Sequence, residues 1–200
     1  SYISHLKDDG IELMKIFNNG KLFVEMNLLG SKKNGLYISY DSIGRVTSKG
    51  NYSDNLKTGI WEDYVYDNQL IGKVIAEYDS GKKEGKLQKI LIVDNYEQVI
   101  NEMNYKNGEI SGRGIGFLGD TIFVCNFKKG ELSGLYNGYL CPDSLRKTDV
   151  NKVDLEKLKL LFEGNYMFGR KTGIWKYNYR DQSENFSYLT KTYRDNKLNG

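Results

Sequence analysis

The sequence predicts an all-β protein, a repeat array of antiparallel β-hairpins that forms an elongated, curled single-sheet meander. Three observations predict it: a recurring aromatic-to-glycine spacing, turn residues at a fixed place between the two, and β-prone runs on either side. The spacing is seven residues and recurs at Tyr52/Gly59, Tyr78/Gly85, Tyr105/Gly112, Tyr166/Gly173 and Tyr193/Gly200, with Leu28/Gly35 and Phe127/Gly134 as variants. Successive glycines lie 24, 26, 27, 22, 39 and 27 residues apart. A period of this size indicates a stack of one small supersecondary unit.

Each repeat carries a turn signal three residues after its aromatic residue. Asn107-Gly108 is the clearest instance, because both residues tolerate the positive φ of a tight hairpin turn. Glycine or asparagine fills the same slot in most repeats, at Asn55, Gly81, Gly108, Gly130, Gly169 and Asn196, whereas Ser31 is the exception. The runs before these turns, such as 73–78, 99–105 and 121–127, are rich in β-branched and aromatic residues, as strands are.

One connection is longer than the rest. The 39-residue step contains the polar stretch 142–157, which exceeds the usual spacing by roughly a dozen residues. We expect a single domain over residues 1–200 with an insertion at about 142–157, a loop with a helical turn, after which the strand resumes near Leu158.

Two rows of aromatic residues are expected on opposite faces of the sheet. The position two residues after the repeat glycine carries Tyr37, Trp61, Tyr136 and Trp175, and the position five residues after it carries Tyr40, Tyr64, Phe117 and Tyr139. The two positions differ by three, so on a regular strand their side chains point to opposite sides. We interpret the first row as a core ladder and the second as the candidate binding face, although the sequence does not show which face is buried.

Charge and hydropathy narrow the classes of partner. The net charge of +3 comes from 29 basic and 26 acidic residues that are interleaved, whereas a nucleic-acid binder gathers its basic residues in a stripe. No apolar run approaches the ~20 residues of a membrane helix. We therefore expect neither nucleic acid as a partner nor an integral membrane segment.

Residues for catalysis are sparse, so no enzyme activity, cofactor or metal is expected. The sole histidine, His5, could flank a metal with Asp8 and Asp9, but a solvated segment is the simpler interpretation. The glycine-rich run 112–116 lacks the spacing of a phosphate-binding loop, and Gly114 marks a weakened repeat. A hydrolase that uses a pair of carboxylates is the least favoured of three functional hypotheses, and it is kept because a sheet could bring two carboxylates together.

Cys125 and Cys141 are the two cysteines, and they do not decide whether the protein resides in an oxidising or a reducing compartment. Cys125 reads as a small apolar core residue, and a bridge between the two thiols requires close α-carbons that the sequence does not reveal. A cytoplasmic location is favoured, and export is the alternative if the N-terminus has been trimmed.

The repeats resemble a known family. The runs 50–64 and 164–177, which read GNYSDNLKTGIWEDY and GNYMFGRKTGIWKY, are similar to bacterial MORN-repeat variants, among them the YwqK family of antitoxins. The resemblance covers residues from about 11 to 200. It implies a meander of β-hairpins, no catalysis, and a scaffold, antitoxin or immunity role. The long tyrosine-to-glycine spacing departs from the eukaryotic pattern of relatives that act near membranes.

The leading hypothesis is thus a non-enzymatic protein-protein interaction module that uses one face of the sheet and the insertion. The alternative is a cell-surface protein that binds glycans or choline-type ligands, since aromatic hairpins also stack sugars and cage quaternary ammonium groups.

Overall fold

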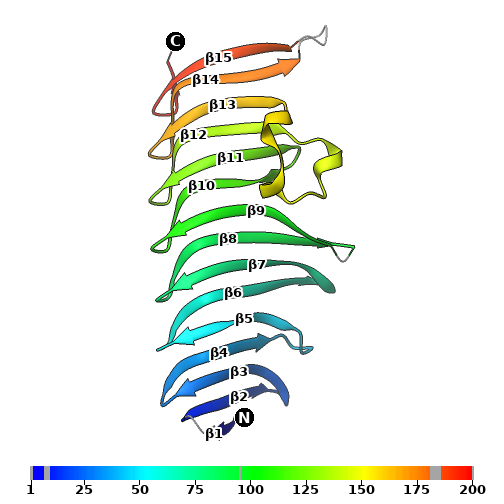
Figure 1. Ribbon diagram of the computed structural model, residues 1–200, viewed down its shortest axis with the longest axis vertical. Coiled ribbons are helices and arrows are strands. Elements are labelled where there is room, and N and C mark those ends of the chain that lie inside the picture. The colour runs from blue at the N-terminus through cyan, green and yellow to red at the C-terminus, as the bar shows by residue number, and fades with distance from the viewer. Residues whose placement is uncertain (1, 7–9, 95, 181–185, 200) are drawn as a thin grey trace. The chain divides into compact units, whose positions relative to one another are not determined.

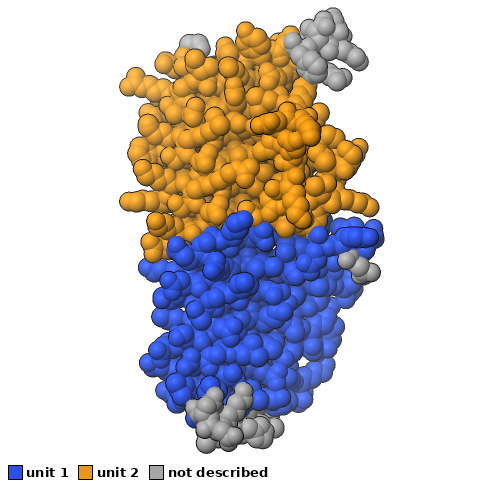
Figure 2. All heavy atoms as spheres, viewed as in Figure 1, with its two compact units in different colours: residues 1–97 blue, residues 98–200 orange. Residues whose placement is uncertain are grey.

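The computed structural model describes residues 2–6, 10–94, 96–180 and 186–199. The chain divides into two compact units, unit 1 (residues 1–97) and unit 2 (residues 98–200), which Figure 2 shows in blue and orange. In each unit the strands follow one another in chain order, and each pairs antiparallel with the next, as Figure 1 shows. The predicted all-β array of antiparallel hairpins is confirmed.

Unit 1 contains the strands β1 (Tyr2–Leu6), β2 (Ile11–Asn18), β3 (Lys21–Leu29), β4 (Lys32–Tyr40), β5 (Val46–Ser53), β6 (Leu56–Asp67), β7 (Gln69–Asp79) and β8 (Lys82–Val93). β9 (Tyr96–Lys106) begins at the end of unit 1 and runs into unit 2. Unit 2 continues with β10 (Glu109–Leu118), β11 (Thr121–Lys128), β12 (Glu131–Leu140), β13 (Leu160–Met167), β14 (Arg170–Arg180), β15 (Phe186–Arg194) and β16 (Lys197–Leu198).

The long connection between β12 and β13 carries three short 3-10 helices. These are η1 (Asp143–Leu145), η2 (Val150–Lys152) and η3 (Leu155–Lys157). Backbone hydrogen bonds close its two ends, because Leu140 N donates to Lys159 O and Cys141 N donates to Asp120 O, both at 2.8 Å. We call residues 141–159 the insertion.

The repeat glycines bend the strands. Gly35, Gly59, Gly85, Gly112, Gly134 and Gly173 have φ between 64° and 99°. The strand register shifts opposite or beside each of them, as between Lys49 and Asn51 across from Gly59. A residue with positive φ at a bulge is most easily glycine, which explains why the glycine recurs.

The turns stack on one another through a second set of hydrogen bonds. The turn N–H of Asn55 donates to Lys33 O at 3.0 Å, and that of Gly81 donates to Lys57 O at 2.9 Å. The same bond recurs in unit 2 at Gly130, Gly169 and Asn196. The predicted positive φ is confirmed at all six slots, while in the first hairpin Gly30, rather than Ser31, takes it.

Candidate functional site: an open sheet face

The first aromatic row forms a packed cluster in unit 1, on what we call the tryptophan face. Trp61 is only 1% exposed, and its ring lies 5.7 Å from Tyr37, 5.0 Å from Tyr52 and 6.4 Å from Tyr78, measured between centroids. Its Nε1–H donates to Asn51 O at 3.0 Å, which satisfies the indole while it is buried. Lys57 Nζ covers the ring at 3.9 Å from the centroid.

Unit 2 repeats this cluster around Trp175. The indole is 1% exposed, donates to Asn165 O at 3.2 Å, and contacts the rings of Tyr136, Phe162, Tyr166, Tyr177 and Tyr193. Lys171 Nζ stands 4.2 Å from the indole centroid. In this row the two tryptophans are fully buried, whereas Tyr37 and Tyr136 are half-buried.

A glycine lies beneath each tryptophan ring, a relation that the sequence interpretation missed. A Cβ on Gly50 would lie 2.3 Å from Trp61, and one on Gly164 would lie 2.1 Å from Trp175. Both pairs are eleven residues apart. That shared spacing was the available signal.

The weakened repeat at Gly114 is filled by its neighbours. A Cβ on Gly114 would lie 2.3 Å from Met103 Sδ and 3.3 Å from Cys125 Sγ, so the space that holds an aromatic ring elsewhere is occupied. Cys125 is 1% exposed, and burial raises the pKa of its thiol to about 11. Cys125 and Cys141 are both free thiols, which answers the question of a bridge.

The second aromatic row lies on the opposite face, the tyrosine face, and in unit 2 the insertion covers it. Val150 is completely buried against Ile115, Ile122 and Cys141. Phe117 and Tyr139 of the predicted binding row pack against this core. These two side chains are therefore part of an internal contact in unit 2.

Polar bonds fix the insertion to this face. Gln98 Nε2 donates to Thr148 O at 2.8 Å, and the backbone N–H of Val99 donates to Asp149 Oδ1 at 2.9 Å. Asn151 Nδ2 donates to the buried Glu102 at 2.9 Å. The pKa of Asp149 is lowered by its bond with Lys152 and then by that with Val99 N–H.

In unit 1 the tyrosine face carries Tyr40 and Tyr64 amid paired charges. Tyr40 donates its hydroxyl hydrogen to Glu25 at 2.7 Å, and Lys15 pairs with the same carboxylate at 2.6 Å. Bonds from Lys15 and Tyr40 hold the pKa of Glu25 below its usual value. Burial, followed by the bond to Glu25, raises the pKa of Tyr40 to about 12.

Tyr64 repeats this arrangement two strands further on. Its hydroxyl donates to Glu62 at 2.7 Å, and Lys49 approaches the same carboxylate at 3.3 Å. Burial opposes ionisation of Glu62, but the bonds from Tyr64 and Lys49 outweigh it, and the pKa of Glu62 is lowered. Both carboxylates are thus held ionised by the same pair of partners, a lysine and a tyrosine.

Exposed aliphatic side chains accompany these tyrosines. Leu36 is 47% exposed and Ile60 is 62% exposed, each immediately after a repeat glycine. Leu36 lies four residues before Tyr40 and Ile60 four before Tyr64, so all four share the tyrosine face. This face of unit 1 combines aromatic, aliphatic and charged groups and is the candidate functional site.

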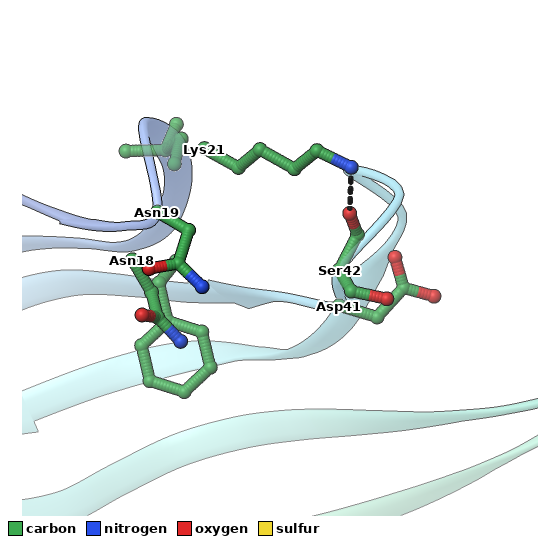
Figure 3. A pocket seen from close by; sticks show the side chains of 7 residues that line it. Asn18, Asn19, Lys21, Asp41 and Ser42 are labelled. Atoms are coloured by element: carbon green, nitrogen blue, oxygen red, sulfur yellow. Dashed lines mark hydrogen bonds between the residues drawn. The ribbon is translucent and has the colours of Figure 1, made fainter.

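A small pocket lies at the turns of unit 1, with a volume of about 230 Å³. Asn18, Asn19, Lys21, Asp41 and Ser42 are among its lining residues, as Figure 3 shows. Lys21 Nζ donates to Ser42 O at 2.7 Å, and the neighbouring Asp41 pairs with Arg45 at 2.7 Å. The cavity is small and is confined to the turns, whereas the tyrosine face offers aromatic and aliphatic side chains on several strands, so the pocket is the weaker candidate.

The described part of the chain lacks the features of a metal site and of a membrane-spanning helix. No group of three metal-ligating side chains occurs among these residues, and no described helix is long and apolar enough to cross a membrane. The group His5, Asp8 and Asp9 lies outside the residues whose side chains the structure describes.

Comparison with models of protein families finds none that matches this chain, and no curated protein matches it either. The likeness to MORN repeats therefore rests on the quoted residues alone.

Proposed function

We propose that the protein is a non-enzymatic interaction module that binds another protein through the tyrosine face of unit 1. The family resemblance suggests the kind of role, which is that of an antitoxin, an immunity protein or a scaffold. Tyr40 and Tyr64 would supply rigid aromatic contacts at small entropic cost, as tyrosine does at many interfaces.

One observation carries the proposal: the chain covers this face in unit 2 and leaves it open in unit 1. In unit 2 the insertion packs Val150 against Ile115 and Ile122, whereas no described segment of unit 1 packs over Tyr40 and Tyr64 in this way. Leu36 and Ile60 are exposed beside these tyrosines, and Leu135 and Ile174 are exposed at the same repeat position in unit 2. The unit 1 face therefore presents exposed aliphatic residues beside tyrosines that the insertion does not cover. An interface would bury them and gain about 25 cal/mol per Å² of apolar surface.

The chemistry of the face supports binding over hydrolysis. A glycosidase requires one carboxylic acid whose pKa is raised, so that it can donate a proton. The pKa values of Glu25 and Glu62 are both lowered by bonds from lysine and tyrosine. Neither carboxylate is suited to act as a general acid.

The glycan or choline alternative has less support. On the tryptophan face the ring surfaces that would cage a quaternary ammonium group already face lysine ammonium groups, Lys57 over Trp61 and Lys171 over Trp175. A ligand cation would have to displace a charge that the chain itself provides.

Affinity capture from the native cells tests the proposal, with any captured protein purified and rebound to the bait by calorimetry. The test variant is Leu36→Asp/Ile60→Asp. The control is Leu135→Asp/Ile174→Asp, which changes the same repeat position in unit 2 at exposures of 47% and 61%. We expect the first variant to lose the partner and the second to retain it. Equal binding by both folded variants would refute a role for this face.

A further inference from the structure

The tyrosine face of unit 1 has a symmetric order of side chains across five strands. Strand pairing places one residue from each of β2 to β6 in a single row, in the order Lys15, Glu25, Ile38, Lys49 and Glu62. Ile38 lies at the centre. Each half contains one lysine and one glutamate, and the two halves carry opposite charges at equal distances from Ile38.

A two-fold axis along β4 would make this row complementary to itself. If a second copy lies face to face, Lys15 of one copy meets Glu62 of the other, and Glu25 meets Lys49. Ile38 meets its own equivalent. Each of the two contacts occurs twice, so one alignment forms four ion pairs between the copies and an apolar centre, in addition to the Lys15–Glu25 and Lys49–Glu62 pairs within each copy.

The row on one side of the centre has the same symmetry. Alternation along the strands puts Leu13, Asn27, Leu36, Asn51 and Ile60 on this face, with Leu13 paired to Asn27 and Leu36 to Asn51. Register shifts interrupt the row between Asn27 and Leu36 and between Asn51 and Ile60. The same axis would bring Leu13 onto Ile60, Asn27 onto Asn51, and Leu36 onto Leu36. Aliphatic residues meet aliphatic residues, and amides meet amides.

The row on the other side supplies aromatic residues. Phe17, Tyr40 and Tyr64 follow Lys15, Ile38 and Glu62 by two residues and share their face. The axis places Phe17 of one copy against Tyr64 of the other and Tyr40 against Tyr40. The charges of the central row thus select the axis, and the named side chains on either side are compatible with it.

From this agreement we infer that the partner of the unit 1 tyrosine face is a second copy of this chain, bound face to face about an axis along β4. The inference deepens the proposed function and rests on it, since it names the occupant of the same face. Sheets that pack in this way lie about 10 Å apart with their strands within about 30° of alignment.

The matching row of unit 2 lacks this property. It reads Glu102, Ile115, Val124, Asn137 and Glu163 across β9 to β13. An axis through Val124 would place Glu102 against Glu163, two like charges, and the insertion already covers the apolar centre. Self-association is therefore specific to unit 1.

The size of the interface indicates a reversible dimer. Five strands at about 4.8 Å spacing span roughly 19 Å between the outer two, and the three rows cover about 14 Å along the strands. Such a footprint, about 270 Å² on each copy, is smaller than that of stable specific interfaces, so we expect a weak, transient dimer. Since the central row associates through ion pairs of partly exposed side chains, added salt should weaken the dimer.

Sedimentation equilibrium of the purified protein, across protein and salt concentrations, tests the inference with two complementary variants. Lys15→Glu/Lys49→Glu makes the central row wholly acidic, and Glu25→Lys/Glu62→Lys makes it wholly basic. We expect each variant alone to be monomeric, with its Kd raised at least about tenfold, and their equimolar mixture to form a 1:1 dimer. Lys176→Glu, which breaks the equivalent 3.1 Å pair with Glu163 in unit 2, should leave the wild-type Kd unchanged.

Two results would overturn the inference: a wild-type protein that stays monomeric at every concentration, or two folded variants whose mixture does not associate. Circular dichroism establishes folding. If either variant fails to fold, Ile38→Asp replaces the pair, and an unchanged Kd in that variant counts against the dimer. Loss of the dimer together with capture of a different protein that depends on Leu36 and Ile60 would refute the second copy but uphold the proposed function.

Discussion

The tyrosine faces of the two units are built on the same repeat, but the insertion packs on the face of unit 2 and the face of unit 1 is open. Three residues after the repeat glycine, unit 1 has Glu62 where unit 2 has Ile115. Five residues before the repeat aromatic, unit 1 has Lys73 where unit 2 has Ile122. The apolar residues of unit 2 receive the insertion, and the charged residues of unit 1 pair with each other and remain open.

The tryptophan faces, in contrast, are alike. Trp61 and Trp175 are equally buried, each lies over a glycine, and each donates to an asparagine carbonyl. The comparison separates two roles of the repeat. One face stabilises every unit, and the other face is free to diverge toward an internal or an external contact.

The largest effect is expected from removal of a tryptophan, in either unit. Trp61→Ala and Trp175→Ala should each lower the free energy of unfolding by about 3–5 kcal/mol, because a large buried ring is replaced by a cavity. Urea denaturation measures the loss. A cost below about 1 kcal/mol in one unit would show that the tryptophan faces are not equivalent.

A charge at the buried centre of the insertion should separate the two tyrosine faces. Val150→Asp places a carboxylate among Ile115, Ile122 and Cys141 and should cost about 3 kcal/mol or more. Ile60→Asp, on the open face of unit 1, should change stability by no more than about 0.5 kcal/mol. Similar losses in both variants would contradict the distinction between a covered and an open face.

A methyl group beneath a tryptophan should have a moderate effect. Gly50→Ala requires the Trp61 ring to move, since the new Cβ would lie 2.3 Å from it, and should cost about 1–3 kcal/mol. Gly130→Ala is the control for added side-chain bulk, since a Cβ there meets nothing within 4 Å, although its φ of 83° adds backbone strain. The quenching or shift of tryptophan fluorescence in Gly50→Ala alone would identify ring displacement.

The smallest effect is the acid sensitivity of the open face. The pKa of Glu25 is lowered in the folded protein, so its contribution to stability is present above the ordinary value of 4.5 and is lost as pH falls through the folded value. Urea titrations of wild type and Glu25→Gln at pH 7 and pH 3 measure this difference. The two proteins should differ more at pH 7 than at pH 3, and an equal difference at both would contradict the assignment.

Much of the fold was predictable because its causes are local. The turn at Asn107-Gly108 and the recurring glycine are required by the backbone conformation within a single hairpin, so the sequence alone predicts the hairpins. Opposite faces for Trp61 and Tyr64 follow from strand alternation. The bulge at each repeat glycine was not predicted, since a recurring glycine does not specify which register shift it permits.

The candidate site was only partly predictable. Tyr40 and Tyr64 were named, but Phe117 and Tyr139 were grouped with them, because the polar sequence of 142–157 gives little sign that Val150 would dock on the sheet. Ile115 and Ile122, which are apolar where unit 1 is charged, were the available signal. The symmetry of the central row required the strand register, and the sequence alone does not provide it.

Cross-linking at Ile38 tests most directly the claim that the open face of unit 1 binds a second copy of the chain. A cysteine there would lie on the proposed axis and face its own equivalent, within reach of a short bismaleimide. Cys125 and Cys141 are buried with raised pKa values, so their background reaction should be slow. We predict efficient cross-linked dimers from Ile38→Cys and few from Lys176→Cys, its repeat equivalent in unit 2. Equal, low yields from both folded variants would contradict the claim that a second copy binds this face.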